Sequence, residues 1–242
     1  MSKKSNSFQN WKKVWNSRTI ELNTRSQLLD ELIKANGFDT GVGDYSTEDW
    51  QILTAFLSKK FSLNNNSKVF EIGCGSGAFL YSLKQHSGCK ISGVDYSQPL
   101  IKIAQENIDG DFKVCDAKDN WRLKAKVDYI ISHSVFNYFP DMEYVAKVLE
   151  NTFLNLKKGG LIALLDLNNL EKEREYHDLR KKLYVTPEKY EEKYQLHSHL
   201  FFSIDSLVST LEEIGFKNIK LFENPCKNYL NSQFRFNLMA KK

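Results

Sequence analysis

The stretch EIGCGSGAFL at 71–80 constrains the fold of this chain more than any other feature. An apolar run leads into it and an amphipathic run leads out, so the glycines occupy a turn between a strand and a helix. Gly73, Gly75 and Gly77 permit positive φ angles and close approach of the backbone to a ligand. Backbone N–H groups and a helix N-terminus can then face polar atoms. The stretch therefore predicts a binding site for a nucleotide-type cofactor.

The glycines alone do not choose the cofactor, because their pattern also fits the dinucleotide fingerprint G-x-G-x-x-A of NAD(P) dehydrogenases. Asp95 ends the next expected strand, 22 positions after Gly73, where a carboxylate can bind ribose hydroxyls. Glu71 is acidic where a dehydrogenase fingerprint usually stays apolar, and a buried carboxylate there needs donors such as a ligand ammonium or loop amides. Asp116 and Ala117 follow the third expected strand and suit an adenine amine and ring.

From residue 68 onward, short apolar runs alternate with amphipathic runs, which predicts a doubly wound, mostly parallel α/β sheet. The expected strands are 68–72, 91–95, 112–116, 127–132 and 161–167. The expected helices are 78–85, 98–107 capped by Ser97, one capped by Asp141, and one from Ser203 to Gly215. The runs 217–222 and 233–240 then predict an antiparallel hairpin at the edge of the sheet.

Two segments stand outside this alternation. Residues 1–66 predict an N-terminal cap of helices with a glycine-rich loop, in which helical spacing continues over 20–33 and a helix begins at Ser46 or Thr47. Within the remaining domain, 67–242, the charged and aromatic insertion 171–202 follows the fifth strand, where open α/β sheets bind ligands. We interpret this insertion as a helical lid; the alternative is a solvated surface insertion. We expect the whole chain to form one globular unit.

The successive motifs EIGCGSGAFL, GVDYS, CDA, DYIISHSVFNYFPD and LKKGGLIALLDL resemble those of class I S-adenosylmethionine-dependent methyltransferases. The match covers about residues 68–168, and GF-x-x-I at 215–219 resembles the last helix-to-strand junction of that family. The resemblance implies a Rossmann-like, seven-stranded sheet whose last strand is inserted antiparallel. It also implies S-adenosylmethionine as the cofactor and S-adenosylhomocysteine as the product.

The resemblance further implies a role for each motif residue. Glu71 and the loop 73–77 are expected to hold the methionine portion, and Asp95 the ribose. The adenine is expected to contact Tyr96, Asp116 and Ala117, while Ser132 and His133 form the wall beside the sulfonium.

Methyl transfer from a sulfonium requires alignment of the reacting atoms, exclusion of water and, for a hydroxyl acceptor, removal of a proton. His133, His197 and His199 are the candidate general bases, although a structural role remains open for each. Because no carboxylate accompanies the two histidines of His197-Ser198-His199 at ligand spacing, we expect no metal. Aromatic faces favour a cationic cofactor. The candidates for the substrate side are Trp11, Tyr45, Phe136 and Tyr138.

The loop SHSVFNYF lacks the Asn/Asp-Pro-Pro-aromatic stretch typical of methyltransferases that act on nucleic-acid bases. The formal net charge of +4 is spread along the 242 residues and forms no basic stripe. We therefore expect an oxygen or nitrogen acceptor on a small molecule. A nucleic-acid methyltransferase and a non-catalytic subunit that retains the cofactor fold are the alternatives.

The four cysteines lie far apart and form no C-x-x-C pair. No apolar run is long enough for a membrane span, and the N-terminus lacks the apolar core of a secretory signal. These features predict a cytoplasmic protein without a membrane partner. We expect it to be a monomer or homodimer.

Overall fold

Seven strands form one sheet in the order β3-β2-β1-β4-β5-β7-β6 in the computed structural model, which describes residues 3–19, 27–39, 43–226 and 228–242. Strand β7 is antiparallel to both of its neighbours, and the other pairs are parallel. The seven-stranded, mostly parallel sheet and the insertion of an antiparallel last strand are thus confirmed. The strands are β1 (Lys68–Ile72), β2 (Lys90–Asp95), β3 (Asp111–Val114), β4 (Val127–His133), β5 (Leu156–Asn168), β6 (Lys217–Phe222) and β7 (Arg235–Lys241).

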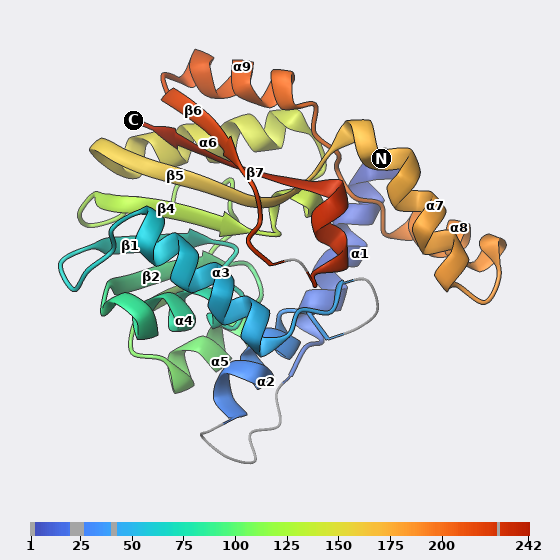
Figure 1. Ribbon diagram of the computed structural model, residues 1–242, viewed down its shortest axis with the longest axis horizontal. Helices are drawn as coiled ribbons and strands as arrows, with labels where there is room; N and C mark the ends of the chain where they lie inside the picture. Colours follow the sequence, from blue (N-terminus) through green and yellow to red (C-terminus); the bar gives the residue numbers. More distant parts are fainter. Residues whose placement is uncertain (1–2, 20–26, 40–42, 227) are drawn as a thin grey trace.

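Helices cover both faces of this sheet, with α3, α4 and α5 on one side and α6 and α9 on the other (Figure 1). Helices α1, α7 and α8 lie beyond the end at which β4 finishes (Figure 1). The helices are α1 (Lys3–Asn16), α2 (Leu28–Ala35), α3 (Thr47–Lys60), α4 (Ala78–Ser87), α5 (Gln98–Asn107), α6 (Met142–Asn155), α7 (Glu173–Leu183), α8 (Pro187–Leu196) and α9 (Ile204–Ile214).

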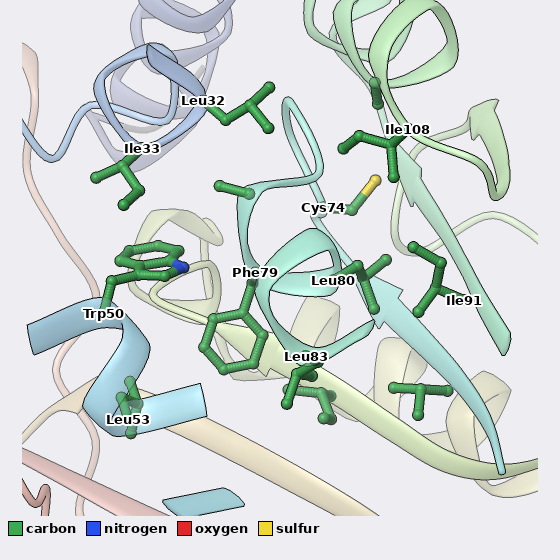
Figure 2. Packing of buried hydrophobic residues seen from close by; sticks show 14 of the residues in the cluster. Leu32, Ile33, Trp50, Leu53, Cys74, Phe79, Leu80, Leu83, Ile91 and Ile108 are labelled. Atoms are coloured by element: carbon green, nitrogen blue, oxygen red, sulfur yellow. The ribbon is translucent and has the colours of Figure 1, made fainter. Parts of the chain in front are cut away.

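The core divides at the sheet because successive strand residues point to opposite faces. Val69 and Ile131 belong to the cluster under α3, α4 and α5, whereas Phe70 and Ile130 belong to the cluster under α6 and α9. In the first cluster, Trp50 of α3 packs edge-on against Phe79 of α4, and Leu32 and Ile33 of α2 belong to the same cluster (Figure 2). This packing fixes α4 against the sheet, and so fixes the glycine turn that precedes α4.

Side-chain caps set several of the helix starts that the sequence predicted. The side chains of Ser46, Asp141, Thr186 and Ser203 each accept a hydrogen bond from a backbone N–H in the first turn of the following helix. Ser97 also precedes its helix, but it does not cap it, because its hydroxyl donates to the Trp15 carbonyl oxygen at 3.1 Å. The contact ties the end of α1 to the start of α5.

The observed elements differ from the predicted ones at several ends; strand β7, for example, begins at Arg235 instead of residue 233, because Leu230–Phe234 forms a 3-10 helix. Strand β5 begins at Leu156 instead of residue 161, because Leu156 pairs with Val127 before a register shift. Strand β3 ends at Val114 instead of residue 116, since the chain turns there, with the Asp119 N–H donating to the Asp116 carbonyl oxygen. The helix expected over 20–33 begins at Leu28, and its part at 20–26 lies outside the described residues.

Candidate functional site

A cavity of about 610 Å³ opens beyond the ends of β1, β2 and β4 and is enclosed by residues of α1, α7 and α8. Two parts of its wall differ in composition. The glycine-turn half consists of Glu71, Gly73, Gly75, Asp95 and Tyr96. The arginine half, on the side of α7, consists of Tyr176, Arg180, His199, Asn231 and Arg235.

The glycine turn is a close-fitting backbone loop. The φ angles of Gly73, Gly75 and Gly77 are 72°, 52° and 82°, values that residues with a side chain rarely adopt. A Cβ atom on Gly73 would lie 2.5 Å from Val135, which also lines the cavity. A Cβ atom on Gly77 would lie 2.6 Å from Ile108. Gly77 therefore allows close packing at the start of α4, although it does not line the cavity. The glycines therefore shape the wall and admit no side chain.

Glu71 is the residue of this turn that lacks a partner. Its side chain is 2% exposed, and its Oε2 atom has no hydrogen-bond partner among the described residues. Burial, with a smaller contribution from Asp95, raises the pKa of the Glu71 carboxyl well above its usual range. A buried carboxylate is costly unless a donor or cation meets it. An amino acid ammonium at the cavity end of Glu71 fits this requirement.

Asp95 fastens the glycine turn to the end of β2. Its Oδ2 accepts a hydrogen bond from the Gly75 N–H at 3.0 Å, and its Oδ1 accepts one from the Ser97 N–H at 2.8 Å. Burial raises the pKa of Asp95 to about 6, although both backbone donors act in the opposite direction. Each oxygen has a further lone pair for ribose hydroxyls. The adjacent Tyr96 lines the cavity beside it.

Asp116 lies outside the cavity wall, in the part of the chain that the structure describes, and its carboxylate is already engaged. It forms an ion pair with Lys12 of α1 at 2.8 Å and accepts a hydrogen bond from the Tyr144 hydroxyl. Ala117 is buried next to it and does not line the cavity either. Lys12 also lies over the ring of Tyr96, 5.0 Å from its centroid, so Asp116 is near Tyr96 but anchors α1 and does not line the cavity. The adenine contact of Asp116 and Ala117 stays a prediction.

His133 ends β4 among aromatic rings. It stacks between Phe38 and Phe79, with ring centroids 5.4 Å and 4.8 Å away, and Trp50 approaches edge-on at 5.0 Å. Burial lowers the pKa of His133 to about 4, so the ring is neutral near pH 7. Its Nε2 atom has no hydrogen-bond partner within the described ranges. The preceding Ser132 is buried, donates to the Ile72 carbonyl oxygen at 3.0 Å and does not line the cavity.

His199 and His197 lie on the far side of the cavity, next to α1. Nδ1 of His199 is 3.2 Å from the Tyr176 hydroxyl, and its ring centroid lies 5.0 Å from that of Trp11. Burial lowers the pKa of His199 well below its usual value, and Arg235 and Arg180 lower it further. His197 also packs edge-on against Trp11, at 5.1 Å. The structure thus brings these two histidines together, while His133 occupies a separate aromatic cage.

The aromatic candidates for the substrate side fall into two groups. Trp11 and Tyr138 line the cavity and contact each other edge to face, with centroids 4.8 Å apart. Tyr45 and Phe136 are buried, and neither is among the described residues that line the cavity. Tyr45 packs on Tyr229 at 4.3 Å, and Phe136 packs on a neighbouring phenylalanine. Both therefore support the wall from behind.

The sequence analysis did not single out the residues of the arginine half other than His199. Tyr176 and Arg180 are four residues apart on α7 and so share one face of that helix. That spacing was the available signal, and it was hidden in a highly charged segment. Arg235 was the single charged residue within the run 233–240, which otherwise reads as a buried strand.

Two further properties bear on the class of protein. Across 3–19, 27–39, 43–226 and 228–242, no helix has the length and apolar character needed to cross a bilayer. Within the same ranges, no three His, Cys, Asp or Glu side chains are grouped so that they could hold a metal ion.

Comparison with known proteins identifies related sequences. A family model described as a methyltransferase domain matches residues 44–221. The chain is 26% identical over 116 residues to the malonyl-(acyl-carrier protein) O-methyltransferase of Bacillus anthracis. The aligned region covers 46% of this chain and 41% of that protein. It is 26% identical over 175 residues to the phosphoethanolamine N-methyltransferase of Plasmodium falciparum, covering 68% of this chain and 65% of that protein. The chain thus spans less than two thirds of either relative.

Solved structures share the fold. The magnesium protoporphyrin IX methyltransferase of Synechocystis PCC 6803, solved with bound S-adenosylmethionine, superposes with a TM-score of 0.57 at 15% sequence identity. The superposition covers 100% of this chain and 98% of that chain. The arrangement of sheet, helical segments and strand insertion described above is therefore one that known methyltransferases adopt.

Proposed function

The chain belongs to the methyltransferase-domain family, and on that premise we propose that it transfers a methyl group from S-adenosylmethionine to an oxygen or nitrogen atom of a small-molecule acceptor. The observation that carries the proposal is the buried Oε2 atom of Glu71, which lacks a hydrogen-bond partner among the described residues and belongs to a residue that lines the cavity beside the glycine turn. A dinucleotide has no ammonium to place there, whereas the methionine portion of S-adenosylmethionine does.

The residues of the glycine-turn half would hold this cofactor. Glu71 would bind the ammonium, Gly73 and Gly75 would admit the methionine portion, and Asp95 would accept hydrogen bonds from the ribose hydroxyls. Tyr96 would contact the adenine. When bound, S-adenosylmethionine supplies a methyl group activated by a sulfonium. The protein's contribution is to align the acceptor with that group and to keep water out.

The aromatic wall suits both tasks. Trp11, Tyr138 and the segment 171–202 would act as cap and lid, because they enclose the cavity on the side away from the sheet. A neutral imidazole can accept a proton from an acceptor hydroxyl. His199 is our first candidate for that base, because it lies in the arginine half and is neutral near pH 7. His133 and His197 are alternatives.

The size of the cavity supports a small acceptor. A volume of about 610 Å³ falls within the usual range of small-molecule sites, and this cavity must also accommodate the cofactor. A folded nucleic acid would need an open, basic surface instead. The acceptor is thus expected to be of metabolite size.

Calorimetry of the wild-type protein with S-adenosylmethionine tests the proposal. We expect saturable binding at one site per chain, and we expect Glu71→Gln to weaken it by about tenfold or more through loss of a charge-assisted hydrogen bond. Glu213→Gln, at an exposed position of α9, is the matched control and should bind as the wild type does. Absence of binding by the wild type, or equal binding by Glu71→Gln, would reject the proposal. Binding of NADH in its place would favour the dehydrogenase alternative.

A further inference from the structure

Two guanidinium groups lie in the arginine half of the cavity, and they differ in how their charge is met. Arg235 of β7 forms an ion pair with Asp166, with 2.6 Å between Nη1 and Oδ2, and the two side chains are 8% and 1% exposed. Arg180 of α7 has no carboxylate partner in the described part of the chain. Its Nη2 donates to the Asn231 amide oxygen at 2.8 Å, and its Nη1 is buried with no hydrogen-bond partner there.

A chain of neutral groups connects the two arginines. Asn231, which accepts from Arg180, donates to the Tyr229 hydroxyl at 3.2 Å, and that hydroxyl donates to Asp166 at 3.0 Å. Asp166 is the carboxylate that meets Arg235. The network therefore contains two cations and one anion. Its excess positive charge lies on the Arg180 side.

The rest of the wall does not neutralise this charge. Among the described residues, the acidic side chains that line the cavity are Glu71 and Asp95, both in the glycine-turn half. On the side of α7 and α8 the wall adds a further cation, Lys193. Hydroxyl-bearing aromatic side chains surround Arg180, and its guanidinium lies over the ring of Tyr176 at 3.6 Å from the centroid.

An uncompensated cation in such a place is costly, because removal of a charge from water is repaid only by a partner of opposite charge or by a full set of hydrogen bonds. The ring of Tyr176 meets one face of the guanidinium and the Asn231 amide meets one of its nitrogens. The Nη1 donors are closed off from solvent, so a ligand oxygen would meet them once the guanidinium turns toward the cavity that Arg180 lines. A planar guanidinium pairs with carboxylate and phosphate groups through two parallel N–H donors.

We propose that the acceptor is an anion whose carboxylate or phosphate group is bound by Arg180, an inference that rests on the proposed methyl transfer. The anionic group would lie on the α7 side, while the atom to be methylated points across the cavity toward the glycine turn. The neighbouring tyrosines would add neutral donors to the same oxygens. A neutral or cationic acceptor would leave the charge of Arg180 unmet.

The test uses the full chain saturated with S-adenosylhomocysteine. Inorganic phosphate is titrated in one arm and acetate in the other, at an ionic strength held constant with sodium chloride, and the side-chain N–H signals of arginine are followed by NMR. We expect saturable binding in at least one arm, and the arm that saturates identifies the class of anion. Arg180→Gln should weaken that binding by about tenfold to a hundredfold, and Arg180→Lys by less, because lysine keeps the charge but loses the paired donors.

Arg174→Gln is the matched control, because this arginine lies on the same helix with its side chain 94% exposed. It should bind the anions as the wild type does. Affinity for S-adenosylmethionine, measured on all variants, shows whether each is folded and separates the two hypotheses. Failure of the wild type to bind S-adenosylmethionine rejects the proposed function. Normal binding of S-adenosylmethionine together with no saturable anion binding, or with equal binding by Arg180→Gln, rejects the anionic acceptor alone.

Discussion

The two halves of the cavity are built in opposite ways. The glycine-turn half is acidic and lies at the ends of two neighbouring strands. Its shape depends on glycines at which an added side chain would clash with neighbouring residues. The arginine half is basic and is assembled from side chains of α7, β7 and the segments before and after them. A cavity with this polarity suits two ligands of different charge, a cofactor with an ammonium group and an acceptor with an anion.

The largest expected effect is on folding stability, which should depend strongly on the buried ion pair of the arginine half. Asp166→Asn leaves Arg235 buried without its ion pair, and breaking a buried pair costs about 3–5 kcal/mol. We expect the free energy of unfolding in urea to fall by that amount. Glu150→Gln breaks an exposed pair with Lys147 and should cost less than about 1 kcal/mol. Equal losses in the two variants would show that the arginine half does not depend on its buried charge.

A second contrast concerns pH, because His133 lies against the glycine-turn half in an apolar cage. Its pKa is about 4 when folded and 6.5 in the unfolded chain, so between these values the unfolded chain binds more protons. Stability is then lost as pH falls from 6.5 toward 4, by at most about 3 kcal/mol. His133→Phe should remove this loss.

The pKa of Asp95, raised to about 6, acts with the opposite sign, since the folded chain then holds its proton more tightly than the unfolded chain. The measurement is therefore the difference in the slope of stability against pH between wild type and His133→Phe. Asp95 is common to both proteins and cancels. Parallel curves from pH 6.5 to pH 4 would contradict the cage around His133.

The glycine-turn half was predicted from the sequence because local backbone geometry encodes it. Glycines with positive φ, a strand before them and a helix after them all lie within about 20 consecutive residues. Glu71 and Asp95 are found from their spacing to this turn. The doubly wound sheet followed for the same reason, since each strand and helix has its own periodic pattern, whereas the seven strands with an inserted last strand were implied by the resemblance to class I methyltransferases.

The arginine half could not be predicted in this way. Arg180 and Asn231 are in contact but 51 positions apart, and no periodicity connects them. Aromatic residues were equally ambiguous, because the same side chain serves in a core or in a binding wall. Trp11 lines the cavity, whereas Tyr45 supports it from behind. Asp116 follows a strand end as the pattern requires, yet Lys12, from the distant N-terminal helix, engages its carboxylate.

A third test asks whether the turn is fixed by space as well as by φ. Gly73→Ala places a methyl group 2.5 Å from Val135 in a left-handed backbone, which should cost about 2–3 kcal/mol and weaken binding of S-adenosylmethionine by about tenfold. Gly88→Ala has a similar φ of 68° but meets its nearest neighbour only at 3.6 Å. It should cost about 1 kcal/mol and leave cofactor affinity unchanged. Thermal unfolding and calorimetry measure both effects.

The smallest expected effect concerns α1, the element that touches both halves. Lys12 reaches Asp116 behind the cofactor side, while the neighbouring Trp11 packs on His199 in the arginine half. Lys12 and Asp116 are partly exposed, at 25% and 15%, so their ion pair should contribute only about 1 kcal/mol. Lys12→Met keeps an unbranched apolar side chain but loses the charge, and with it the ammonium that lies over the Tyr96 ring at 5.0 Å from the centroid.

We expect Lys12→Met to bind S-adenosylmethionine about threefold to fivefold more weakly, mainly through faster dissociation, because α1 then opens more often over the glycine-turn half. Anion binding at Arg180 should not change, since Trp11 still holds α1 against His199. Lys13→Met, at the exposed neighbouring position, is the control, because it removes one positive charge but keeps the Lys12–Asp116 ion pair. Stopped-flow dissociation rates measure the effect. If Lys12→Met weakened the binding of S-adenosylmethionine and of the anion equally, α1 would cover both halves as one unit. The two halves would then differ in charge but open and close together.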